Sequence, residues 1–194
     1  MTAMDEAQEA LGQGEAARRA GRPQEALDAF CRAVALLRAE GEGSGLAHAL
    51  TRLAQALRDL RRAGEALPLQ EEAVHILRHG GDTLSLARAL RHLGGILDDQ
   101  AAHARAMPVY EEMMALYSGM ETAPLEMANA VRSLACNAEA RGDRSDAVEK
   151  WQDALGRYTA LDAVFRQDYG LPDNPGVKEA QTRLMALRGE PDPI

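Results

Sequence analysis

Apolar residues recur along the chain at helical spacing, and the same arrangement returns about every 40 residues. Four groups of positions fall in register when the segments are aligned: Ala26, Phe30 and Ala33; Ala66, Gln70 and Ala73; Ala106, Tyr110 and Met113; and Ala147, Trp151 and Ala154. The leading alanines are 40, 40 and 41 residues apart. A fixed period of this length in an apolar, helical sequence predicts a stacked repeat.

Each repeat has the pattern of two amphipathic helices joined by a short turn. We predict repeats over residues 2–40, 44–80, 83–118 and 122–160, with internal turns at 21–23, 63–64, 101–103 and 142–143. Ser44 is expected to cap the first helix of the second repeat. Pro68 and Pro108 share one repeat position, and we place both near the first turn of a helix, where few amide bonds are lost.

The period fails after the fourth repeat, over residues 161–173, where we expect a frayed helix end and an irregular link. The sequence Asn174-Pro175 is a strong helix-start signal, an N-cap followed by proline at the first helical position. It opens a predicted capping helix over 175–188, which would cover the last repeat. Residues 1–189 are therefore predicted to form a single domain, and residues 190–194 a disordered tail.

Composition supports an all-α fold and narrows the function classes. Aromatic residues make up only 4% of the chain, and alanine and leucine dominate, which favours close helix packing over a sheet. The formal charge of −8 argues against nucleic acid as a partner. Cys31 and Cys136 are far apart and have no metal-ligand spacing, so we interpret them as reduced thiols of a cytoplasmic protein. The sequence shows no secretory signal and no membrane span, and it predicts no cofactor.

The pattern resembles the tetratricopeptide repeat (TPR) family over nearly the whole chain. The second-helix signature of that family, alanine–aromatic–alanine, is present as Ala26-Phe30-Ala33 and Ala147-Trp151-Ala154 and partly as Ala106-Tyr110-Met113, whereas Gln70 takes the aromatic place in the second repeat. The first-helix signature, a large apolar residue followed by a small one, is present as Leu53-Ala54, Leu93-Gly94 and Leu134-Ala135, whereas the first repeat has Gln13-Gly14. The period exceeds the usual ~34 residues, so the chain is most similar to the long-repeat, kinesin light chain type. HEAT-type repeats share the longer period but lack this phase, and we rank them second.

The resemblance implies a right-handed α-solenoid of four helix-turn-helix repeats plus the capping helix, with first helices lining a concave groove. Carrying over the groove positions of the family gives this set: His48, Thr51, Gln55, Arg58, Arg88, Arg91, Asp98, Asn129, Arg132 and Cys136. We hypothesise that the arginines in this set hold an acidic or C-terminal peptide and that Asn129 grips its backbone. In the competing interpretation, these arginines are solvated or paired with Asp98, Asp99 and Glu139.

No pattern points to a reaction, and we interpret the chain as a non-catalytic interaction module, a scaffold or adaptor. His75 and His79 lie four residues apart, but a zinc site needs a third ligand, and we interpret the pair as an exposed helix end. Two alternatives stay open: a protein that homo-oligomerises, as a homodimer for example, and a regulatory protein that senses a ligand. The segment 165–172 is a further possibility, because it could fold back into the groove and compete with the partner.

Overall fold

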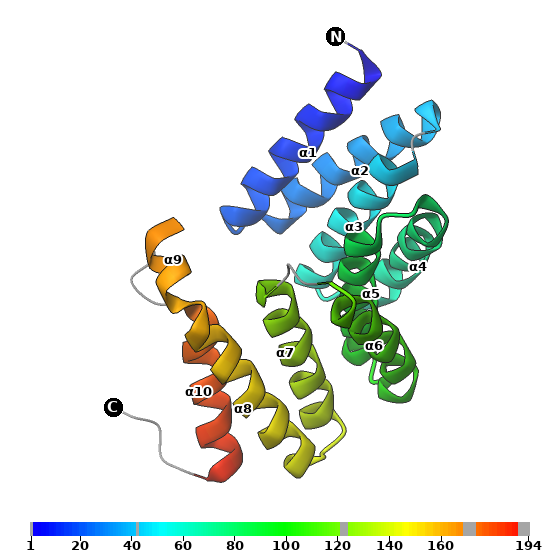
Figure 1. The fold of residues 1–194 in the computed structure, drawn as a ribbon. Helices are drawn as coiled ribbons and strands as arrows, with labels where there is room; N and C mark the ends of the chain where they lie inside the picture. The colour runs from blue at the N-terminus through cyan, green and yellow to red at the C-terminus, as the bar shows by residue number, and fades with distance from the viewer. Residues whose placement is uncertain (1, 42, 121–123, 169–173, 190–194) are drawn as a thin grey trace. The chain divides into compact units, whose positions relative to one another are not determined.

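The structure is a computed structural model that describes residues 2–41, 43–120, 124–168 and 174–189. These residues form ten α-helices and no strand (Figure 1). In chain order the helices are α1 (Ala3–Arg19), α2 (Pro23–Glu40), α3 (Gly43–Asp59), α4 (Ala63–Gly80), α5 (Thr83–Asp99), α6 (His103–Ser118), α7 (Pro124–Ala140), α8 (Arg144–Ala160), α9 (Asp162–Asp168) and α10 (Pro175–Arg188). The prediction of an all-α fold is therefore confirmed.

The chain divides into two compact units, which we describe separately: an N-terminal unit, Met1–Ala102, and a C-terminal unit, His103–Ile194. In the N-terminal unit, α1 pairs with α2 and α3 pairs with α4, while α2 packs on α3 and α4 packs on α5. In the C-terminal unit, α7 pairs with α8, α6 contacts α7, and α10 lies beside α8. The single domain predicted over 1–189 stays a prediction.

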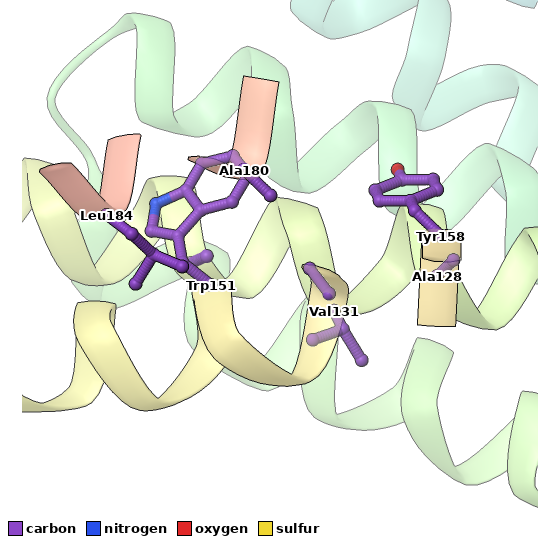
Figure 2. Packing of buried hydrophobic residues seen from close by; sticks show 8 residues of the cluster. Ala128, Val131, Trp151, Tyr158, Ala180 and Leu184 are labelled. Atoms are coloured by element: carbon purple, nitrogen blue, oxygen red, sulfur yellow. The ribbon is translucent and has the colours of Figure 1, made fainter. Parts of the chain in front are cut away.

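The aligned second-helix positions form the centre of the packing, as the period predicts. All twelve are buried, and the aromatic members are almost completely enclosed, with exposed fractions of 0% for Phe30 and Trp151 and 1% for Tyr110. Figure 2 shows Trp151 in the C-terminal unit among Val131, Ala180 and Leu184. Its indole Nε1 donates a hydrogen bond to Glu139. Helix α10 therefore covers the apolar side of the last repeat, which is the role predicted for a capping helix.

The turn inside each repeat has one recurring hydrogen-bond pattern. At the end of α3, the amide of Arg61 donates to the Arg58 carbonyl at 2.9 Å, and the amide of Arg62 donates to the Leu57 carbonyl at 2.8 Å. The same pair of bonds ends α1, α5 and α7. This is the Schellman arrangement, in which the residue after the helix takes the left-handed conformation. The four left-handed residues are Gly21, Arg61, Ala101 and Gly142, with φ of 68°, 61°, 56° and 75°.

Several local predictions are wrong. The turn of the second repeat lies before Ala63, which is the first residue of α4, and not at 63–64, because Arg61 ends α3 in the left-handed conformation. Ser44 is the second residue of α3 and not the residue before the helix, where an N-cap lies. A helix, α9, forms over part of the segment predicted to be irregular. The fold-back predicted for 165–172 and the disordered tail predicted for 190–194 involve residues outside those that the structure describes.

Candidate interaction groove

The first helices of the repeats line a groove of about 820 Å³ in the N-terminal unit. Its walls come from the end of α1, the second half of α3, the α3–α4 turn and α5. The lining residues are Arg18, Arg52, Gln55, Arg58, Asp59, Arg61, Ala63, Arg91, His92 and Asp99. Five guanidinium groups and two carboxylates thus face the same space, so the groove carries an excess of positive charge in a chain whose formal charge is −8.

Two ion pairs of identical sequence spacing join successive first helices. Arg18 Nε lies 2.6 Å from Asp59 Oδ2, and Arg58 Nε lies 2.6 Å from Asp99 Oδ2. A second contact also recurs, because Arg18 Nη1 donates to Gln55 Oε1 at 2.9 Å and Arg58 Nη2 donates to the Gly95 carbonyl at 3.2 Å. The repeat geometry therefore brings an arginine of one repeat to the same two places on the next repeat each time.

Gln55 is the buried centre of the polar network, with an exposed fraction of 5%. Its Oε1 accepts from Arg18 at 2.9 Å and from Arg52 at 3.2 Å. Because both guanidiniums are donors, the oxygen must face them, and the amide Nε2 faces His92 Nε2 at 2.9 Å. The imidazole nitrogen therefore accepts this bond, which requires a neutral His92 with its proton on Nδ1.

Electrostatics favour the same neutral state of His92. Burial and the nearby guanidiniums, Arg91 first among them, hold the pKa of His92 well below its ordinary value. Burial and the charge of Arg52 also lower the pKa of His48, whereas Glu15 opposes that change. The positive charge of the groove therefore comes from arginines at neutral pH.

Two of the five groove arginines have no carboxylate partner in the part of the chain that the structure describes. Arg18, Arg52 and Arg58 each have a carboxylate partner, and for Arg52 it is Glu15, at 2.6 Å. Among the described residues, Arg61 and Arg91 have no ion-pair partner. The Nε of Arg91 is buried and has no hydrogen-bond acceptor in the described part of the chain. Arg91 therefore lines the groove with a guanidinium that no carboxylate of the described residues neutralises, and this is the charge that an anion would meet there.

The structure brings three of the predicted groove residues together: Gln55, Arg58 and Arg91. Four others lie on the same two helices but outside the lining: His48, Thr51, Arg88 and Asp98. The remaining three, Asn129, Arg132 and Cys136, lie on α7 in the C-terminal unit. Use of this set as a peptide-binding site stays a prediction.

The predicted α7 residues are engaged within the C-terminal unit. Arg132 makes two bonds of 2.6 Å to the carboxylate of Glu179 on α10, and this pairing raises the pKa of the Arg132 guanidinium. Asn129 Oδ1 accepts from the Tyr158 hydroxyl at 2.7 Å. These residues line a separate, smaller pocket of about 330 Å³. The competing interpretation, paired arginines, thus describes both Arg58, whose partner Asp99 was named from the sequence, and Arg132, whose partner is Glu179 instead.

The two cysteines and the predicted histidine pair show no arrangement that supports catalysis. Burial raises the pKa of the Cys136 thiol and of the Cys31 thiol, which disfavours the thiolate in both. His79 Nδ1 lies 2.8 Å from the His75 carbonyl at an exposed helix end. Within the described ranges, no group of three or more His, Cys, Asp or Glu side chains is placed to hold a metal ion.

Sequence reasoning missed six of the lining residues: Arg18, Arg52, Asp59, Arg61, Ala63 and His92. Arg18 belongs to the first repeat, whose first helix departs from the family pattern at Gln13-Gly14, and no groove positions were carried onto it. Arg52 and His92 each follow a predicted groove position by one residue and lie along a neighbouring line of the helix surface. One usable signal exists in the sequence: Arg18 and Asp59, like Arg58 and Asp99, are opposite charges 41 residues apart, close to the repeat period.

Comparison with solved structures assigns the fold to the TPR-like class. The chain is similar to a kinesin light chain-type protein of Podosopora anserina with nearly identical TPR-like repeats, at 20% identity, covering 92% of this chain and 86% of that one, with a TM-score of 0.67. A Rap protein in complex with Competence and Sporulation Factor is similar at 14% identity over 97% of this chain and 56% of that one, with a TM-score of 0.75. BtubC from P. vanneervenii is similar at 16% identity, with coverage of 100% and 96% and a TM-score of 0.55.

These similarities establish that the chain has a TPR-type repeat fold, as the sequence resemblance predicts. No protein-family profile matches the sequence, and no curated protein matches it either. Within the described residues, no helix is long and apolar enough to cross a bilayer.

Proposed function

We propose that this chain is a non-catalytic interaction protein whose N-terminal groove binds an acidic segment of a partner protein. One observation carries the proposal: an arginine-lined groove on an acidic protein, in which Arg61 and Arg91 lack carboxylate partners among the described residues. Guanidinium groups bind carboxylates through paired, charge-assisted hydrogen bonds, so an acidic peptide has the complementary chemistry. The TPR-like neighbours are consistent with a protein partner, since the Rap protein was solved with a bound factor.

The paired arginines add specificity to the proposed site. Arg18 and Arg58 are held in place by Asp59 and Asp99, so their remaining N–H groups are oriented before a ligand arrives. Such ordering lowers the entropic cost of binding. Gln55 fixes Arg18 and Arg52 in the same way from a buried position. A flat basic surface without these contacts would bind anions less selectively.

A matched set of variants tests the proposal. The probe is a fluorescein-labelled hexaglutamate peptide, compared with hexaglutamine by fluorescence anisotropy at 0.1 M salt. We expect hexaglutamate to bind at least tenfold more tightly, and Arg91→Gln to weaken it by about fivefold to tenfold, since a charge-assisted bond is lost. The control is Arg38→Gln, which removes one positive charge from α2, outside the groove.

Two outcomes would contradict the proposal. Equal affinity for the two peptides would show that carboxylates are not recognised. An equal loss for Arg38→Gln and Arg91→Gln would show a dependence on total charge and not on the groove. Circular dichroism of both variants would confirm that the helices are intact.

Self-association is a second candidate because the C-terminal unit has a pocket that is lined partly by apolar side chains. A cavity of about 490 Å³ lies between α8 and α10, with Leu155, Leu184 and Met185 among its lining residues. A second copy could cover this surface and form a homodimer. Sedimentation velocity over a hundredfold range of concentration tests this possibility, and a constant monomeric coefficient would exclude it. For either function we propose a cytoplasmic protein that binds neither nucleic acid nor membranes.

A further inference from the structure

Arg61 occupies a backbone position that elsewhere in the chain suits glycine. It is the left-handed residue of the turn that ends α3, and the equivalent residues in the first and fourth repeats are Gly21 and Gly142. A side chain in this conformation brings Cβ close to the carbonyl oxygen, so a non-glycine residue lowers stability relative to glycine. The third repeat has the same loss of stability, because Ala101 has the same conformation, with φ of 56°.

The conformation alone therefore does not distinguish Arg61, but its side chain does. Arg61 lines the arginine-rich groove beside Ala63 and Arg58. The two carboxylates of that groove, Asp59 and Asp99, are held by Arg18 and Arg58. Arg61 is exposed and has no ion-pair partner among the described residues, whereas Ala101 contributes only a methyl group.

We infer that Arg61 is a specificity-determining residue of the groove, which contacts a second carboxylate of the ligand in addition to the one received by Arg91. This inference rests on the proposed function. It narrows the ligand to a segment with at least two acidic side chains, because the groove offers two unneutralised guanidiniums on different elements, the α3–α4 turn and α5. The lower stability of the turn is then the consequence of placing a cation there.

The chain supplies a control for this inference at the equivalent turn. Arg61→Gly and Ala101→Gly relieve the same conformation, so both should raise the urea midpoint of unfolding. Of these two glycine variants, only Arg61→Gly should weaken hexaglutamate binding, by about fivefold. Arg61→Ala keeps the left-handed side chain but removes the charge, so it should weaken binding to the same extent without raising the midpoint.

The experiment measures the urea midpoint and hexaglutamate affinity for the wild type, these three variants and Arg91→Gln. Loss of binding in Arg61→Gly and Arg61→Ala, but not in Ala101→Gly, supports the inference. Wild-type affinity in both Arg61 variants, with weaker binding in Arg91→Gln, overturns the inference and leaves the proposed function standing. An unchanged urea midpoint in Arg61→Gly also overturns the inference, because Arg61 would then not lower the stability of the turn. A wild-type protein that does not bind hexaglutamate overturns both.

Discussion

Gln70 is a polar side chain at a position that holds a large aromatic residue in the other three repeats. It is completely buried, and its Nε2 donates to the Ala89 carbonyl at 2.9 Å and more weakly to Thr51 Oγ1 at 3.4 Å. Its Oε1 is buried and has no donor in the described part of the chain. The interface between α4 and α5 therefore contains a buried amide oxygen that has no donor among the described residues.

This arrangement predicts that an apolar residue of similar size would be more stable at position 70. Replacing Gln70 with leucine removes the unsatisfied oxygen, whose burial costs roughly 1–3 kcal/mol, and sacrifices hydrogen bonds worth about 1 kcal/mol. We expect Gln70→Leu to raise the free energy of unfolding by about 1 kcal/mol in urea denaturation. Gln70→Ala should instead lower it, because it leaves a cavity. A loss of stability in the leucine variant would mean that the contact with Ala89 outweighs the unsatisfied oxygen.

His92 predicts a pH dependence of stability that can be assigned to one side chain. Its pKa in the folded protein lies well below the ordinary value of about 6.5, which the unfolded chain retains. Between the two pKa values the unfolded state binds one more proton, so stability falls as pH decreases below about 6.5, by at most ~1.4 kcal/mol per pH unit. Protonation would also place a hydrogen on Nε2, opposite the donating amide of Gln55.

The measurement is the urea midpoint between pH 5 and pH 8 for the wild type and for His92→Gln. The variant should lose much of the slope below pH 6.5. Some slope should remain, because the pKa of His48 is lowered too, and His48→Gln separates that contribution. Identical slopes in the wild type and His92→Gln would show that the pKa of His92 does not differ between the folded and unfolded states.

At the scale of the helix, Gly14 explains how the first repeat packs like the other repeats despite its atypical sequence. A Cβ at this position would lie 2.4 Å from Cε1 of Phe30, so only glycine allows α1 to approach the aromatic ring so closely. The same alignment places Ala54, Gly94 and Ala135 at the equivalent positions, all of them buried. The unusual Gln13-Gly14 pair therefore conforms to the steric rule, a small residue against the aromatic side chain.

The two glycines of α1 should consequently respond in opposite ways to alanine. Gly14→Ala should lower the free energy of unfolding by roughly 1–3 kcal/mol, because the Phe30 ring must move. Gly12 is exposed and has nothing within 4 Å of its virtual Cβ, so Gly12→Ala should raise stability by about 0.5–1 kcal/mol through helix propensity. Thermal unfolding followed by circular dichroism measures both. Destabilisation by Gly12→Ala would contradict the helix packing described here.

Much of the element order could be predicted from the sequence because certain residue types mark the buried positions of a helix and the residue at which a helix begins. The period placed every aligned alanine and aromatic residue in the core, and Asn174-Pro175 correctly marked the start of α10. The α3–α4 turn was misplaced because its stop signal is an arginine in a conformation that residue type does not reveal. Pro68 and Pro108 share a helix position as predicted. They lie in the second turn of α4 and α6, however, and not in the first.

The candidate site was predicted less completely, for a physical reason. Repeat position indicates which face of a helix a residue occupies, and this was enough for Gln55, Arg58 and Arg91. Whether a charge is neutralised depends on contacts between repeats. The pairing of Arg132 with Glu179 on α10 could not be read from the four-repeat alignment, because α10 lies outside the period.

At the scale of the whole molecule, the net charge and the local charge of the groove oppose each other. The formal charge of −8 repels an acidic ligand at long range, whereas the guanidiniums attract it at close range. At 0.1 M salt the Debye length is about 10 Å, so charges on distant surfaces are largely screened. The affinity for an acidic ligand should then depend on the charges in the groove and not on the net charge of the chain.

Two substitutions with the same effect on total charge separate these contributions. Asp99→Asn removes a groove carboxylate and leaves Arg58 without its anionic partner, whereas Glu40→Gln removes an exposed carboxylate at the end of α2, outside the groove. We expect Asp99→Asn to increase hexaglutamate affinity by roughly two- to fivefold at 0.1 M salt, and Glu40→Gln to leave it unchanged. The stability cost of Asp99→Asn should stay within about 1 kcal/mol, because the ion pair is partly exposed. Equal gains in hexaglutamate affinity in the two variants would show that binding depends on the net charge of the whole protein. The groove would then not be a selective site.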